Sequence, residues 1–231
     1  MSGRSYRWLG AAAILTGVLK VAVFPRSFSP GPLTMWLVTR APQLSMTAAL
    51  LIAVSANEVV SLVAALLAAW IAYGLWRASG SGLGAKAFLT AFVLEVLWVL
   101  PWVLLAYEEF FAGYPPLVSL FSVTAVMLRL AALLMLAIGL LRSHLVSAWI
   151  PWAGIASIPA ALVMRSFDFA LLWAFMSATA PVPAAVTARL GAIAAVVGPV
   201  ESTLTLLFWA GLGVSLVWRA STTVDTHGVP A

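Results

Sequence analysis

Apolar stretches recur along the chain, and several reach the roughly 20 residues that a helix needs to cross the hydrocarbon core of a bilayer. Of the 231 residues, 64% are hydrophobic and 8% are charged. A water-soluble domain carries about 25% charged residues, so this chain lacks the polar surface to cover a soluble globule. The stretches do not alternate as barrel strands do, and backbone in hydrocarbon must satisfy its own hydrogen bonds. The sequence therefore predicts an all-α, polytopic transmembrane helix bundle.

Six spans are predicted, in a single transmembrane bundle over residues 1–219. Their ranges are 8–24, 56–76, 87–107, 117–141, 145–164 and 199–218. Ser55 and Glu58 have the Ser-x-x-Glu spacing of a capping box, which predicts a helix start there. Pro199, followed by Glu201, resembles a second such start. The tail, 220–231, is polar and predicted to be flexible.

Three apolar segments are left over, 42–54, 167–178 and 183–197, and each is too short to cross a bilayer comfortably. They are predicted to be interfacial or re-entrant helices on the outer side. The alternative is that 43–76 or 183–218 forms one long tilted helix that projects beyond the bilayer.

Basic residues orient the chain, because cytoplasmic loops carry an excess of Lys and Arg. Six of them fall at one set of helix ends: Arg4, Arg7, Arg77, Lys86, Arg142 and Arg219. Glu108 and Glu109 fall at the opposite set. Both termini are therefore predicted to be cytoplasmic, in the cell membrane.

Three ionisable residues lie within predicted spans, namely Lys20, Glu95 and Arg129. At 1.5 Å per residue they lie about 14 to 20 Å from the basic helix ends, which is the middle of the membrane. A charge there is costly, so we expect Glu95 and Arg129 to face each other rather than lipid. Two interpretations stay open: a charge relay or substrate site, and an ion pair that fixes helix register while Lys20 snorkels.

A second set of charged residues is predicted near the outer surface. Glu58 and Glu201 can cap helices, Arg165 and Asp168 have the i, i+3 spacing of a helical ion pair, and Arg189 can meet Glu201 or a lipid phosphate. These five residues could line an outer vestibule, or form an ordinary solvated rim.

Several chemistries have no support in the sequence. It has no cysteine, and its two histidines, His144 and His227, lack the spacing of a zinc protease or of paired haem ligands. No catalytic motif is present, so no catalytic residue, metal or cofactor is predicted, and the chain is not expected to be an enzyme. The net charge of +5 comes from residues scattered at helix ends, which indicates lipid headgroups rather than nucleic acid as partners.

Two short segments resemble a group of uncharacterised bacterial six-helix membrane proteins of unknown function. The first is LLRSHLVSAWIPWAG, residues 140–154, where a helix ends in Arg and Ser and a Pro, an aromatic residue and a Gly open the next. The second is the start RWLG, residues 7–10. The resemblance implies six spans and brings no activity with it.

Three functions are consistent with these features. The first is a non-catalytic accessory or scaffold subunit that packs in lipid beside other membrane chains or copies of itself, because small Ala and Gly residues favour close helix contact. The alternative is a small ion-coupled or small-solute transporter that uses Glu95 and Arg129. The third is a lipid-modifying membrane enzyme.

Overall fold

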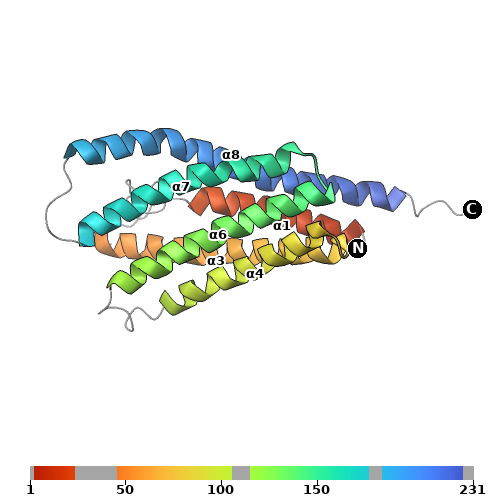
Figure 1. The fold of residues 1–231 in the computed structure, drawn as a ribbon, viewed down its shortest axis with the longest axis horizontal. Coiled ribbons are helices and arrows are strands. Elements are labelled where there is room, and N and C mark those ends of the chain that lie inside the picture. The colour runs from red at the N-terminus through yellow and green to blue at the C-terminus, as the bar shows by residue number, and fades with distance from the viewer. Residues whose placement is uncertain (1–2, 24–45, 106–114, 177–183, 226–231) are drawn as a thin grey trace, which may run out of the picture.

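The computed structural model describes residues 3–23, 46–105, 115–176 and 184–225, and all of its regular structure is helical. The six helices of these ranges are α1 Gly3–Val23, α3 Met46–Ser79, α4 Leu83–Leu105, α6 Pro115–Ser143, α7 Trp149–Met176 and α8 Ala184–Asp225. Figure 1 shows them side by side along one long axis, with the N- and C-terminal ends at the same end of the bundle. The predicted all-helical class is confirmed.

The helices form a closed ring in chain order. Each of α3, α4, α6 and α7 packs against the helix before it and the helix after it, and α8 returns to pack against α1. Short turns explain the sequential pairing. Gly80, which ends α3, has the positive φ of 70° typical of a glycine helix cap, and α4 begins three residues later.

Glycines set how closely the helices approach. A Cβ atom placed on Gly74 of α3 would lie 2.7 Å from Leu9, one on Gly139 of α6 would lie 2.6 Å from Phe88, and one on Gly154 of α7 would lie 2.7 Å from Phe208. Each glycine thus leaves space in which a large side chain of a neighbouring helix packs. Small residues play this part in membrane bundles, where close van der Waals packing replaces the hydrophobic effect between helices.

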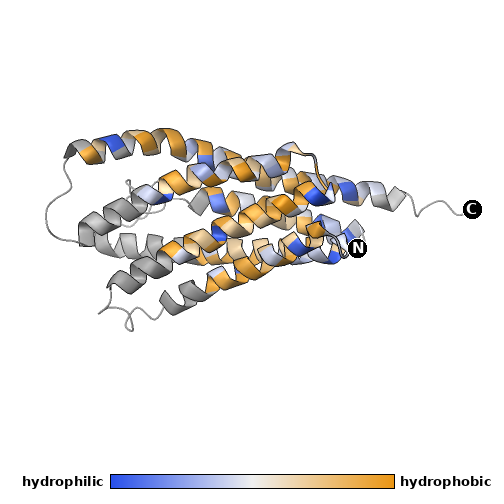
Figure 2. Ribbon diagram, in the orientation of Figure 1, coloured by the Kyte–Doolittle hydropathy of each residue, from blue (hydrophilic) through white to orange (hydrophobic). Residues whose placement is uncertain are grey.

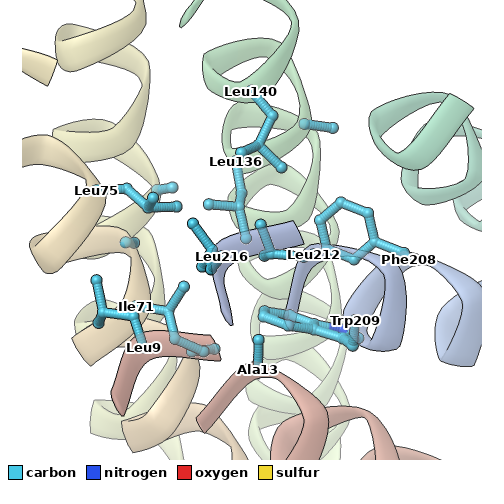
Figure 3. Close-up of a cluster of buried hydrophobic side chains, with 14 of the residues drawn as sticks. Leu9, Ala13, Ile71, Leu75, Leu136, Leu140, Phe208, Trp209, Leu212 and Leu216 are labelled. Carbon is cyan, nitrogen blue, oxygen red and sulfur yellow. The ribbon is translucent and has the colours of Figure 1, made fainter. Parts of the chain in front are cut away.

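The interior near the two termini is filled by side chains. Figure 3 shows residues of α1, α3, α6 and α8 meeting there, among them Leu9, Ile71, Leu136 and Trp209. The ring is therefore a packed bundle at this end, and polar residues in it have to find partners inside protein.

Among the described residues, three helical segments are long and apolar enough to cross a membrane: Val59–Ser79, Val123–Ser143 and Gly191–Thr222. The outer surface carries many exposed apolar side chains, such as Val196 at 68% and Val59 at 61% exposure. Figure 2 shows apolar residues along the length of the helices, hydrophilic residues at the end near both termini, and a few more within the bundle and on the far part of α8.

Two predicted helix starts are wrong. Helix α3 runs through Ser55 and Glu58 without a break, because no Gly or Pro precedes the capping-box motif to end the helix. Helix α8 likewise runs through Pro199. A proline removes one backbone hydrogen bond, and the 15 helical residues before Pro199 and the 26 after it outweigh that loss.

The three short outer helices are therefore not separate elements. Segment 42–54 falls within α3 from Met46 on, 167–178 within α7 as far as Met176, and 183–197 within α8 from Ala184 on. The alternative of long helices is the one the structure adopts. At 1.5 Å per residue, the 42 residues of α8 extend about 63 Å, twice the thickness of a hydrocarbon core.

Two other helix boundaries in the structure differ from the predicted ones. Helix α7 begins at Trp149 instead of 145, after a turn in which His144 has a φ of 50°, and it continues past 164. The predicted flexible tail does not begin at 220, since Ala220 is buried and α8 continues to Asp225. Residues 226–231 lie outside the described residues.

Candidate functional site

Lys20 lies near the end of α1 and is buried in the bundle. Its side chain is 6% exposed, and its Nζ lies 4.7 Å from the centre of the Trp209 ring of α8. Gly17 makes this contact possible, because a Cβ atom there would lie 2.8 Å from Cβ of Trp209. The absence of a side chain at Gly17 thus lets α8 bring an aromatic face to the ammonium, a favourable cation–π arrangement.

Glu95 of α4 forms the ion pair of this site. Its Oε1 lies 4.0 Å from Nζ of Lys20, and its side chain is also 6% exposed. In the ring, α1 packs against α3 and α8, whereas α4 packs against α3 and α6. The pair therefore joins two helices that are not ring neighbours, so it reaches across the interior.

Arg129 of α6 is the third charged residue of the site. Its Cζ lies 5.8 Å from the centre of the Trp98 ring, and Trp98 follows Glu95 by three residues on the same face of α4. Arg129 attracts Glu95 and repels Lys20 through their charges. Lys20, Glu95 and Arg129, the predicted buried cluster, are thus brought together by the fold.

The sequence predicted that Glu95 and Arg129 face each other, and Arg129 does attract Glu95 through its charge. The ion pair of Glu95 in the structure is with Lys20, because Gly17 and Trp209 hold α1 and α8 close enough for the lysine to point into the bundle. Snorkelling of Lys20 to a membrane surface is also excluded, since its ammonium lies against a buried carboxylate.

The predicted outer vestibule is assembled only in part. Arg165 of α7 and Glu201 of α8 are half-buried and interact electrostatically with Arg129, so they extend the buried cluster. Arg189 is exposed on α8. The side chains of Glu58 and Asp168 lie outside the described residues.

Sequence reasoning missed the two tryptophans of the site. Neither was among the predicted site residues, yet Trp98 and Trp209 are 3% and 1% exposed. A signal existed for Trp98, which lies one helical turn from Glu95. For Trp209, no spacing in the sequence relates it to Lys20.

The site brings charged side chains of opposite sign together. Within the described ranges, no three His, Asp or Glu side chains gather as a metal ion would require. What the site does offer is one carboxylate beside two cations, each of which has its own aromatic partner.

No protein family, curated protein sequence or solved structure matches the chain. The resemblance to bacterial six-helix membrane proteins therefore stays a prediction.

Proposed function

We propose that the chain is a multi-pass integral membrane protein whose six helices all cross the bilayer, with both termini in the cytoplasm. Support comes from the apolar outer surface and from the basic residues at the helix ends nearest the termini. Four exposed tryptophans lie at the same end, as expected of residues at a headgroup layer: Trp8, Trp149, Trp152 and Trp218.

Within this bundle, we propose that the Lys20–Glu95 pair is the working centre of a small ion-coupled solute transporter. The single observation that carries the proposal is a buried ion pair that reaches across the interior of an apolar ring. Stability alone gives no reason for it, because apolar side chains of similar volume often stabilise a fold as well as a buried ion pair does. Ionisable residues inside a membrane bundle generally line substrate or ion pathways.

The transport proposal predicts that a solute gradient drives proton flux through the purified protein. The protein would be reconstituted into liposomes that contain a pH-sensitive dye, and salts, amino acids and sugars would be tested as driving gradients. We expect at least one of them to drive flux at least 10-fold faster than in empty liposomes, and Glu95→Gln to abolish that flux because an amide cannot carry a proton.

Lys86→Met is the matched control for Lys20→Met, since Lys86 is the other lysine of the chain and its side chain is exposed. The control should transport like the wild type, and Lys20→Met should not. If no solute drives flux and another membrane chain co-purifies in fixed stoichiometry, the accessory-subunit function replaces transport.

A further inference from the structure

Each of the two cations of the site has a contact that does not involve Glu95. The ammonium of Lys20 lies over Trp209, and the guanidinium of Arg129 lies near the ring of Trp98. Neither contact involves the carboxylate, and the face of an aromatic ring attracts a cation by its quadrupole. Each cation therefore has one favourable contact that protonation of Glu95 does not remove.

The geometry of the contact between Glu95 and Lys20 would also allow another anion to take the place of the carboxylate. Their separation of 4.0 Å is longer than the roughly 2.7 to 2.9 Å of a charge-assisted hydrogen bond. The attraction is thus between charges at close range, and another anion at the ammonium could supply the same attraction.

The net charge of the site determines what must happen to Glu95 when another anion takes its place at Lys20. Lys20, Arg129 and an ionised Glu95 together carry +1, that is, two positive charges and one negative. Protonation of Glu95 raises the net charge of the three side chains to +2, which is costly in a low-dielectric interior. Entry of one monovalent anion restores +1.

We propose that the site binds a small monovalent anion, which replaces the Glu95 carboxylate at Lys20 when that carboxylate takes up a proton. In the forward step the proton binds Glu95 and forms a neutral carboxylic acid, and the ammonium of Lys20 turns its donors to the anion. In release, the anion leaves, the proton leaves, and the ion pair of Lys20 with Glu95 forms again. The inference rests on the proposed transport function and names its substrate class and coupling: electroneutral proton–anion symport.

Other charged and titratable groups around Glu95 do not alter this balance. Helix α6 contributes Arg129, through which Arg165 of α7 and Glu201 of α8 also act. Tyr73 of α3 is exposed, and its ring lies 5.5 Å from that of Phe92 on α4. With Arg165 and Glu201 included, the sum is three positive and two negative charges, again +1. The side chain of Glu58 on α3 lies outside the described residues.

The test measures accumulation of labelled chloride, nitrate and lactate in liposomes that contain the full chain, with the pH gradient and the membrane potential set separately. For electroneutral symport, a gradient of one pH unit, acidic outside, should give about 10-fold accumulation of at least one of these anions. The ratio should not change when potassium and valinomycin impose 100 mV. Were one net charge to move, the same potential would change the ratio about 50-fold, from 2.3 kcal/mol per charge.

Variants separate a binding role of the pair from a structural one. Glu95→Gln should lose accumulation driven by the pH gradient and keep one-for-one exchange of internal for external anion, because the ammonium of Lys20 is then always available. Lys20→Met should lose both processes, and Lys86→Met should keep both. A pair that only held the helices together would give loss of both processes in Glu95→Gln.

The outcomes distinguish this inference from the transport proposal. Accumulation that follows the membrane potential, or proton flux driven by a cation or a neutral solute and by none of the three anions, overturns proton–anion symport and leaves transport standing. The absence of flux with every class of solute overturns both.

Discussion

Replacing Lys20 by methionine is expected to lower the free energy of unfolding by about 3 kcal/mol. The substitution keeps most of the volume of the side chain and leaves the Glu95 carboxylate buried without its ion-pair partner. Breaking a buried pair from one side costs about 3 to 5 kcal/mol, and attraction to Arg129 places this case at the lower end. Unfolding by sodium dodecyl sulfate in mixed micelles measures the difference.

The double variant Lys20→Met, Glu95→Leu should recover most of that loss and lie within about 1 kcal/mol of the wild type, because both charges are then gone. Lys86→Met, at an exposed position, should change stability by less than about 0.5 kcal/mol. If the losses of the single substitutions simply add in the double variant, the two residues are not coupled and the ion pair is not formed.

The second large effect is expected where α1 crosses α8. A Cβ atom on Gly213 would lie 2.5 Å from Cγ1 of Ile14 and 2.6 Å from the carbonyl oxygen of Gly10. One of these neighbours is backbone, so no rotation of a side chain relieves the clash. Gly213→Leu is therefore expected to separate the two helices and cost about 3 kcal/mol or more, at the upper end for overpacking. Loss of a monodisperse species in size-exclusion chromatography, with an earlier unfolding transition, would report it.

Gly191→Leu is the control for this experiment, since it makes the same change on the same helix. A Cβ atom at Gly191 meets nothing within 4 Å. This variant should elute and unfold like the wild type. Equal damage from both substitutions would mean that leucine disturbs α8 itself, and that the close approach of α1 and α8 is not what Gly213 provides.

The helical class and the buried charges could be predicted because both follow from the cost of polar groups in hydrocarbon. That cost required Glu95 to face a cation, and it does. The identity of the cation could not be predicted, because closure of the ring by α1 and α8 decides it. That closure depends on glycine contacts between residues about 200 positions apart in the chain, Gly10 and Gly213 among them.

Helix boundaries could be predicted only where a strong stop is present. Gly80 ends α3 within a few residues of the predicted end at 76, with the chain in the left-handed conformation that glycine permits. Ser55 and Pro199 are typical of helix starts, but they also occur inside long helices when nothing upstream ends the helix. A local motif does not distinguish a helix start from a position inside a long helix. The outcome depends on whether the apolar sequence before the motif is continuous.

The claim on which the others depend is that lipid surrounds this ring and that all six helices cross it. Because the chain has no cysteine, single cysteines can report the side of the membrane on which a residue lies. Four exposed positions at the end near both termini suit this purpose: Arg4, Gly82, Ser147 and Thr222.

In intact cells, an impermeant maleimide should label none of these four cysteines, and after permeabilisation it should label all four. Labelling of some but not all of them from outside an intact cell would place helix ends that the fold holds together on opposite sides of the membrane, and would contradict the six-span arrangement. Labelling of all four from outside would contradict the cytoplasmic orientation of the termini.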